Sequence, residues 1–201
     1  IDVFYLGAGF DAGDRIDGGA DSDFVVLEGD YSAGLALTAA TLVNVETIQL
    51  DAGFSYALSG FTDANLVSGK LTIDGHLLGA GEDMTIDASG VATGGMKVLG
   101  GGGVDSFTGG DGADTLDAGH AAVAFIRGGK GNDFITGSLS GADILGGGQG
   151  NDTIHFYDSA LQVTGGDGDD SLQQYGPVGG PTSVTLDGGD GNDFLAVGPV
   201  G

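Results

Sequence analysis

Five short phrases of glycine and aspartate could bind a metal ion through carboxylate and backbone carbonyl oxygens. They read GGDGADTLD from Gly109, GGKGNDFIT from Gly128, GGQGNDTIH from Gly147, GGDGDDSLQ from Gly165 and GGDGNDFLA from Gly188. Each has glycine at places one, two and four, aspartate at place six and a large apolar residue at place eight. The phrases begin 19, 19, 18 and 23 residues apart, close to two nine-residue units per step. This period predicts a solenoid in which each step adds one coil.

Stacked coils would bring the sixth-place aspartates into one column, about 4.8 Å apart, which is the spacing of neighbouring strands. The column would contain Asp114, Asp133, Asp152, Asp170 and Asp193. Two bare carboxylates about 5 Å apart repel by roughly 3 kcal/mol at an effective dielectric constant near 20. Because a divalent cation between the coils would reverse the sign of this interaction, the sequence predicts metal ions between successive turns.

Calcium is the expected metal. Carboxylate oxygens, together with the carbonyls that a glycine turn leaves unpaired, form the set of six to eight oxygens that Ca²⁺ prefers, whereas Mg²⁺ requires a stricter octahedron. Five stacked turns leave four gaps between them, so we expect about four ions along this edge.

The pattern GGxGxDxUx resembles the calcium-binding repeats of the RTX family, which fold as a parallel β-roll. The resemblance implies that each ion takes the sixth-place aspartates of two neighbouring turns and backbone carbonyls from places one to four. The carbonyl donors that it implies are those of Gly110, Gly112, Gly129, Gly131, Gly148, Gly150, Gly166, Gly168, Gly189 and Gly191. The expected fold class is therefore all-β, a right-handed parallel β-roll and β-solenoid.

The residues also predict the local structure of each phrase. Three glycines within four places allow positive φ and close backbone contact, so the first six residues are expected to form a tight turn and the last three a short strand. One row of apolar residues should line each side of the core. The rows are Leu116, Ile135, Ile154, Leu172 and Leu195, and Phe107, Phe125 or Ile126, Leu145, Val163 and Leu186.

The opposite edge of the coils keeps only part of the motif. GGGGVDSFT from Gly100 matches in full and places Asp105 sixth, while SLSGADILG from Ser138 loses the glycine pair but keeps Asp143. Both aspartates are candidate ligands. The other segments on this side have lost the aspartate, so we expect only one edge to carry a complete metal column.

The first residues contain degraded copies of the phrase. AGDRID places Asp14 sixth, and GGADSDFVV from Gly18 has Asp21 in place of the fourth glycine and Asp23 at place six. Asp14 and Asp23 are nine residues apart and are expected to form one more coil with a calcium ion, although the lost glycine weakens the turn.

Residues 31–99 lack the nonapeptide. LVNVETIQL, SYAL, KLTID, DMTID and GMKVL are typical of strands separated by glycine turns, and their spacing suggests wider coils. Residues 32–40 fit either a helix or another strand. We therefore divide the chain into degenerate repeats (1–30), a strand-rich solenoid segment (31–99) and the calcium-binding roll (100–201). The middle segment is similar to repeats in surface-layer and other large secreted RTX proteins of alphaproteobacteria.

Composition narrows the class of protein. The 201 residues carry a net charge of −24, which would repel nucleic acid and anionic membranes. There is no cysteine, and no apolar run approaches the ~20 residues that span a bilayer, so we expect no membrane insertion. The chain begins inside a nonapeptide, so we expect it to be an excerpt of a longer repetitive protein.

No catalytic motif is present. HExxH and GxSxG are missing, and His76, His120 and His155 are scattered, so we expect no enzyme activity. The main hypothesis is a structural segment of an extracellular or cell-surface bacterial protein, such as a surface layer, an adhesin stalk or a filament, that folds on calcium after export, by type I secretion. The alternative is an export and folding module of an enzyme or toxin whose catalytic domain lies elsewhere. Self-association through the open ends of the roll is a further hypothesis.

Overall fold

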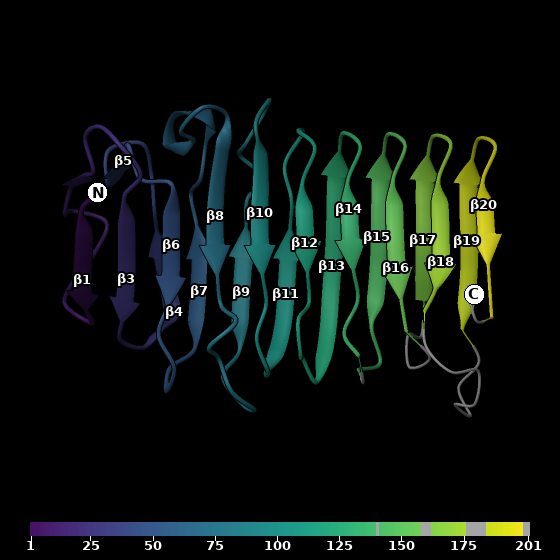
Figure 1. Cartoon of the computed structure of the whole chain (residues 1–201), viewed down its shortest axis with the longest axis horizontal. Coiled ribbons are helices and arrows are strands. Elements are labelled where there is room, and N and C mark those ends of the chain that lie inside the picture. The colour runs from purple at the N-terminus through teal and green to yellow at the C-terminus, as the bar shows by residue number, and fades with distance from the viewer. Residues whose placement is uncertain (140, 158–161, 176–183, 199–201) are drawn as a thin grey trace.

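The computed structural model describes residues 1–139, 141–157, 162–175 and 184–198. These residues form a right-handed parallel β-solenoid of about 9 coils, built from two long sheets that face each other (Figure 1). The helix in this part of the chain is one 3-10 turn, η1 (Asp63–Asn65). The expected all-β fold class is confirmed.

Each coil between the two ends contributes one strand to each long sheet, and all strand pairs within a sheet are parallel. The ten-stranded sheet contains, in spatial order, β1 (Val3–Gly7), β3 (Phe24–Glu28), β6 (Thr47–Leu50), β8 (Lys70–Asp74), β10 (Gly95–Leu99), β12 (Thr115–Asp117), β14 (Phe134–Thr136), β16 (Thr153–Phe156), β18 (Ser171–Gln174) and β20 (Phe194–Ala196). The eight-stranded sheet contains β4 (Tyr31–Ala36), β7 (Tyr56–Ser59), β9 (Met84–Asp87), β11 (Val104–Thr108), β13 (Val123–Lys130), β15 (Ile144–Gln149), β17 (Gln162–Asp167) and β19 (Thr185–Asp190). A short pair, β2 (Ile16–Asp17) and β5 (Leu42–Val43), lies near the N-terminal end.

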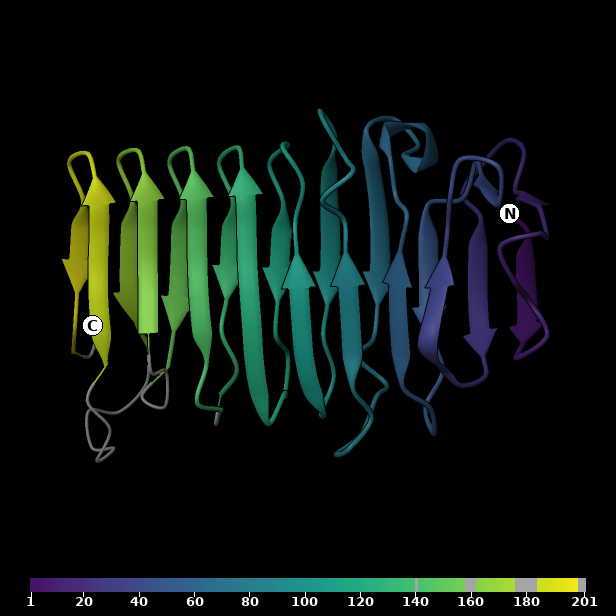
Figure 2. The same cartoon turned by 180° about the vertical axis from the view of Figure 1, so that it is seen from behind.

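The turns form two edges, which Figure 1 draws at the top and the bottom and Figure 2 shows from behind. We call the edge that holds the turns after β13, β15, β17 and β19 the upper edge, and the opposite one the lower edge. Four of the five glycine phrases form this row of compact turns. The same edge carries the turn after β2 and the helical turn η1.

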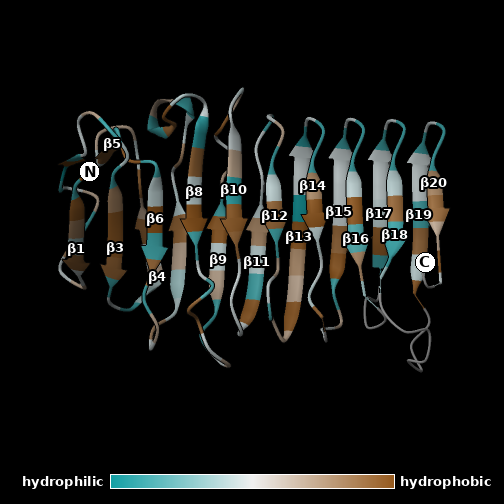
Figure 3. Cartoon of the chain, viewed as in Figure 1, coloured by the Kyte–Doolittle hydropathy of each residue, from teal (hydrophilic) through white to brown (hydrophobic). Residues whose placement is uncertain are grey.

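Buried apolar side chains form one core cluster along the solenoid. Figure 3 colours the strand segments that carry apolar residues brown. The predicted core rows are largely confirmed, with Leu116, Ile135 and Leu145 all buried. Between the two alternatives on β13, Ile126 is the core residue, because Phe125 points outward and is 43% exposed. Leu195 is 42% exposed because β20 is the last strand of its sheet.

The middle segment consists of wider coils, as expected. Leu71 pairs with Met96, 25 residues further along the chain, whereas Leu116 pairs with Ile135, 19 residues further along. Of the two alternatives for residues 32–40, the strand is correct, because β4 runs from Tyr31 to Ala36.

One local expectation is wrong. The first three places of the phrases at Gly128, Gly147, Gly165 and Gly188 belong to strands β13, β15, β17 and β19 rather than to a tight turn. Identical backbones in consecutive coils continue the ladder there, so that Gly129 pairs with Gly148 and Gly148 with Gly166. The chain reverses only at places four to six. The short strands expected at places seven to nine are confirmed by β14 and its equivalents.

Candidate metal centre

The strand register brings the sixth-place aspartates of the roll into one column on the upper edge. Each of them directly precedes a strand of the ten-stranded sheet, and the first residues of these strands are paired from coil to coil. The column contains Asp114, Asp133, Asp152, Asp170 and Asp193. The first four side chains are at most 2% exposed. The predicted column is therefore present and lies inside the turns rather than on the surface.

One oxygen of each carboxylate ties two coils together. The backbone N–H of Asp133 donates to Oδ1 of Asp152 over 2.8 Å, and the N–H of Asp152 donates to Oδ1 of Asp170 over 2.8 Å. Asp114 donates to Asp133 over 2.8 Å, and Asp170 donates to Asp193 over 3.0 Å in the same way. These hydrogen bonds fix the register of the stack without a metal.

The second oxygen has no such partner. Oδ2 of Asp133, Asp152 and Asp170 is buried and accepts no hydrogen bond in the described part of the chain. A buried carboxylate oxygen without a partner costs roughly 1–3 kcal/mol or more, so it requires an explanation. A bound cation would supply one.

The orphaned oxygens lie next to a backbone carbonyl of the following coil. A Cβ built on Gly128 would overlap both Oδ2 of Asp133 and the carbonyl oxygen of Gly147. The same overlap recurs at Gly147, with Asp152 and the Gly165 carbonyl, and at Gly165, with Asp170 and the Gly188 carbonyl. We call this combination of an orphaned Oδ2, a first-place carbonyl of the next coil and a first-place glycine a cradle. The roll contains three of them in its described residues.

The predicted carbonyl donors of these four turns lie along the same edge. Their second and fourth glycines all have left-handed φ, between 97° and 135°. A Cβ on Gly148 would overlap the Gly129 carbonyl oxygen, and one on Gly150 would overlap the Gly131 carbonyl oxygen. The same holds for Gly166 and Gly189 at place two and for Gly168 and Gly191 at place four. These carbonyls therefore face the next coil across each gap.

The carbonyls of the cradles are not among the glycines named as donors from the sequence, although the resemblance covers places one to four. They belong to the first-place glycines Gly147, Gly165 and Gly188. The signal was available, because glycine occupies place one in all five phrases although the strand geometry there does not demand it.

The turn at Gly109 differs from the other four. The N–H of Gly110 donates to Oδ2 of Asp114 over 2.8 Å, so both oxygens of this carboxylate are satisfied. Neither Gly110 nor Gly112 has left-handed φ, and the Gly110 carbonyl accepts the Lys130 N–H over 2.9 Å. Oδ2 of the aspartate is thus satisfied within its own turn, and no orphaned oxygen is left in the gap that follows it.

The two aspartates of the lower edge are not brought together. Asp105 pairs with Ala124, which separates it from Asp143 in the column. Oδ2 of Asp105 accepts the Gly101 N–H over 3.1 Å, and Oδ2 of Asp143 accepts the Ser138 N–H over 2.7 Å. Their Oδ1 atoms accept backbone N–H groups as well. Their buried carboxylates are therefore satisfied by the protein, in contrast to those of the upper edge.

At the N-terminal end the structure separates the two candidates. Asp23 is fully buried, and its Oδ2 is orphaned like those of the roll. Asp14 is exposed, and its Oδ2 accepts the Asp11 N–H over 3.0 Å. The coil pairing puts Asp2, not Asp14, beside Asp23, because Val3 pairs with Phe24. Of the two aspartates that were expected to form one more coil with a calcium ion, only Asp23 has the surroundings of the roll's aspartates.

Burial makes the upper column resist ionisation in the absence of metal. Desolvation raises the pKa of Asp133 to about 7, with a further contribution from the neighbouring carboxylates of Asp114 and Asp152. Desolvation likewise raises the pKa of Asp152 to about 6 and raises the pKa of Asp170. A cation placed among these groups would favour their charged form.

A second ladder at place five was not expected from the sequence. The N–H of Asn151 donates to Oδ1 of Asn132 over 2.8 Å, and the N–H of Asp169 donates to Oδ1 of Asn151 over 2.9 Å. Asn192 continues the ladder to Asp169 over 2.8 Å.

Nowhere in the described residues do three His, Asp or Glu side chains converge as a metal cluster, so a cation in a cradle must also take backbone carbonyls.

Comparison with protein families agrees with this geometry. The family model of the RTX calcium-binding nonapeptide repeat matches residues 98–120, 125–154 and 178–199. These segments therefore carry calcium-binding repeats, of a kind that is typical of secreted bacterial proteins. Searches of curated proteins and of solved structures gave no match. No helix in the described residues has the length and apolar character needed to span a bilayer.

Proposed function

We propose that the chain is a calcium-dependent structural segment of an extracellular or cell-surface bacterial protein, such as a surface layer, an adhesin stalk or a filament. The observation that carries this proposal is the set of orphaned Oδ2 atoms of Asp133, Asp152 and Asp170, each beside a carbonyl of the next coil. The residues present fit Ca²⁺, because hard oxygen atoms are the only donors at the cradles. Calcium would neutralise the column and join consecutive coils into a stiff rod.

The proposed stoichiometry is three ions in the roll. Asp133, Asp152 and Asp170 would each hold one ion, with Asp193 completing the last gap. The remaining gap, which follows the turn at Gly109, would hold no ion, because the Gly110 N–H already donates to Oδ2 of Asp114. This number is one below the four expected from counting gaps.

Calcium would also ensure that the chain folds only after its export. At a net charge of −24 the chain repels itself, so low intracellular calcium would keep it expanded and suited to type I secretion. Outside the cell, calcium that binds only the folded state would drive folding by mass action. Two observations support this order of events, namely the buried column and the few basic residues, 5 in all.

The proposal assigns no catalysis to this chain. His76 lies at the surface beside Asp74, 2.6 Å from its carboxylate, and the His155 ring packs between Phe134 and Tyr175. The rival function, an export and folding module of an enzyme or toxin, uses the same calcium chemistry. The parent protein distinguishes the two, because a catalytic domain there favours the module and further repeats favour the scaffold.

Circular dichroism with and without chelator tests the proposal. We expect the β signal of the roll to be lost in excess EDTA at pH 8 and restored by calcium, and a full β signal in EDTA would refute calcium dependence. Self-association into a lattice or filament is a separate proposal. Light scattering during a calcium titration tests it, and a monomer at every calcium concentration would exclude it.

A further inference from the structure

We propose a further cation site, separate from those of the roll, at the N-terminal end of the upper edge. It lies between the turn of residues 18–23 and the turn of residues 44–46. Its ligands would be Oδ2 of Asp23, the backbone carbonyl of Asn44 and the carboxylate of Glu46. This inference rests on the proposed function, because it assumes that a cradle binds calcium. The site lies outside the segments that match the calcium-binding repeat.

The first observation is the carboxylate of Asp23. Its side chain is 0% exposed, its Oδ1 accepts the Asp2 N–H over 2.6 Å, and its Oδ2 has no hydrogen-bond partner in the described residues. The carboxylate of Asp133 in the roll has the same pattern, because its Oδ1 accepts a backbone N–H of the previous coil and its Oδ2 is orphaned.

The second observation is that Glu46 stands where the roll has its next aspartate. Phe24 pairs with Thr47, so the residues before them, Asp23 and Glu46, share the sixth place of consecutive coils. The N–H of Asp23 donates to Oε2 of Glu46 over 2.6 Å, which repeats the link between Asp133 and Asp152. Glu46 therefore adds a second negative charge to the same gap.

The third observation is the cradle itself. A Cβ on Gly18 would overlap the Asn44 carbonyl oxygen and come within 2.8 Å of Oδ2 of Asp23. In the roll, the equivalent first-place glycines meet an orphaned Oδ2 and a carbonyl of the next coil in the same way. The carbonyl of Asn44 thus replaces that of a first-place glycine, although the turn of residues 44–46 contains no glycine.

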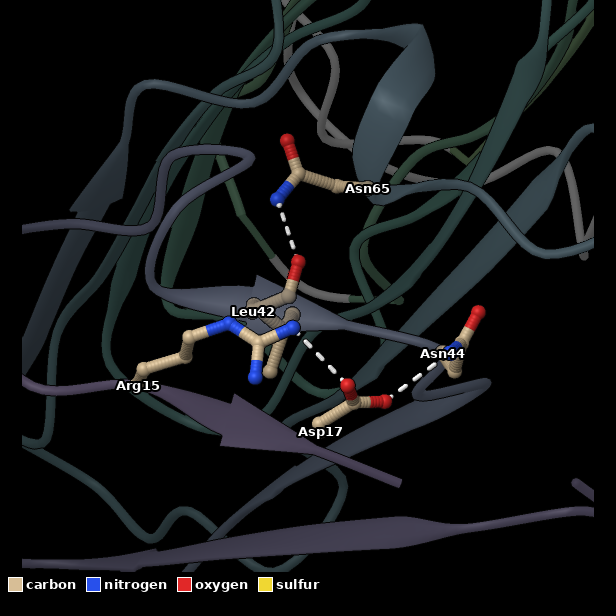
Figure 4. Close-up of polar contacts among 5 residues, drawn as sticks. All are labelled: Arg15, Asp17, Leu42, Asn44 and Asn65. Atoms are coloured by element: carbon tan, nitrogen blue, oxygen red, sulfur yellow. Dashed lines mark hydrogen bonds and ion pairs between the residues drawn. The ribbon is translucent and has the colours of Figure 1, made fainter. Parts of the chain in front are cut away.

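The backbone at Asn44 is held in place by its own side chain. Asn44 adopts a left-handed φ of 51°, and its Nδ2 donates to Oδ1 of Asp17 over 2.9 Å. Arg15 donates to the other oxygen of Asp17 over 2.8 Å, and Asn65 of the following coil donates to the Leu42 carbonyl over 3.0 Å (Figure 4). These contacts fix the short strand β5 and hence the direction of the Asn44 carbonyl.

The site is separated from the roll by coils without charge in the column. The next two coils place Leu71 and Met96 at the sixth place, and both are buried. In the turn at Gly109, Oδ2 of Asp114 is then satisfied within its own turn, so the first orphaned oxygen of the roll belongs to Asp133. The two ends of the solenoid would therefore bind calcium independently, with an apolar middle between them.

Calcium titration calorimetry on the whole 201-residue chain tests the inference at pH 7.5. We expect four ions for the unaltered chain, three in the roll and one at Asp23. Asp23→Asn is nearly isosteric and keeps an acceptor for the Asp2 N–H, so we expect it to bind one ion fewer with the remaining ions unchanged. Asp152→Asn should lose at least one ion of the roll and keep the N-terminal one. Asp190→Asn, which changes an exposed carboxylate on the same edge, should bind as many ions as the unaltered chain.

The outcomes separate this inference from the proposed function. If Asp152→Asn loses calcium while Asp23→Asn binds as much as the unaltered chain, the N-terminal site is refuted and the roll stands. If the unaltered chain binds no calcium, the proposed function itself fails. Should Asp23→Asn fail to give the β signal in calcium, Glu46→Gln decides, because it keeps an acceptor for the Asp23 N–H. We expect the affinity of one ion to fall on the order of tenfold in Glu46→Gln, and unchanged affinities would refute the site.

Discussion

The substitution Asp133→Asn should change stability in opposite directions with and without calcium. In the metal-free chain at pH 8, Asp133 must be ionised although burial raises its pKa from 3.8 to about 7. At about 1.4 kcal/mol per pH unit, keeping this buried charge costs the folded state about 4 kcal/mol. Asparagine removes the charge, and its Oδ1 can still accept the Asp114 N–H. Its Nδ2, a hydrogen-bond donor, would replace the orphaned Oδ2. Because the neighbouring carboxylates share part of the effect, we expect the variant to be more stable by roughly 2–4 kcal/mol in EDTA.

Calcium should reverse the result. At a calcium concentration of about 10,000 times its Kd, a site adds about 5.5 kcal/mol to the stability of the unaltered chain, which is more than the roughly 2–4 kcal/mol that the substitution adds in EDTA, and the variant loses this gain at the affected gap. Urea unfolding followed by circular dichroism measures the free energy in calcium. In EDTA at pH 8, where the roll of the unaltered chain is expected to be unfolded, the β signal that the variant regains measures the gain in stability. The exposed Asp190→Asn serves as the control and should change the free energy of unfolding by less than about 0.5 kcal/mol under both conditions. If Asp133→Asn destabilises the chain in EDTA as much as in calcium, the column is not held together by metal.

Three further predictions concern the pH response, the glycine turns and the apolar middle. In EDTA, the β signal should rise as the pH falls from 8 to 5, because the raised pKa values of Asp133 and Asp152 mean that the folded chain binds protons more tightly than the unfolded chain. This stabilisation is complete below pH 3.8 and is lost as the pH passes through about 6 to 7, so a β signal that is constant across this range would contradict it. Gly148→Ala should cost roughly 3 kcal/mol or more in calcium, because the methyl group would overlap the Gly129 carbonyl and the φ is 123°. Gly53→Ala has a φ of 97° but open space around the new Cβ, so urea unfolding should show a loss of only about 1–2 kcal/mol, and equal losses would refute the stacking argument. Hydrogen exchange in EDTA at pH 8 should find β8 and β10 protected and β14 to β18 exchanging fast, because the buried column carries Leu71 and Met96 in the middle and carboxylates in the roll. Uniform exchange along the chain would contradict this division.

The sequence was sufficient to predict the coil register of the roll. Each phrase repeats both its apolar eighth place and its acidic sixth place, so the same alignment that stacks Ile135 on Ile154 also stacks Asp133 on Asp152. Two independent patterns thus agree on one register, and the column follows from the core.

The state of an individual turn could not be predicted in this way. The phrases at Gly109 and Gly128 share glycine at places one, two and four and aspartate at place six, yet only in the first does a backbone N–H of the same turn donate to Oδ2 of the aspartate. The reason lies in the preceding coil, which has no nonapeptide, so that Asp111 donates its N–H to the Val91 carbonyl instead of stacking on a glycine turn. In the roll, a turn therefore leaves Oδ2 of its aspartate without a hydrogen bond only when the preceding coil has a glycine turn on which it can stack.

The role of Glu46 could not be predicted for a related reason. Its turn has no glycine pair to mark a repeat, and its place in the column follows only from the pairing of β3 with β6. The same pairing corrects the role of Asp14, because a separation of nine residues predicts one more coil of the roll only where coils have the length of two nonapeptides. The coil from Asp2 to Asp23 is longer, at 21 residues.

The most direct measurement is an anomalous diffraction map of crystals grown in calcium. Peaks are predicted beside the Oδ2 atoms of Asp133, Asp152 and Asp170, each also within coordination distance of a carbonyl of the next coil. A map with these three carboxylates well ordered, the coils stacked as described and no anomalous peak beside them would contradict the claim that calcium joins the coils.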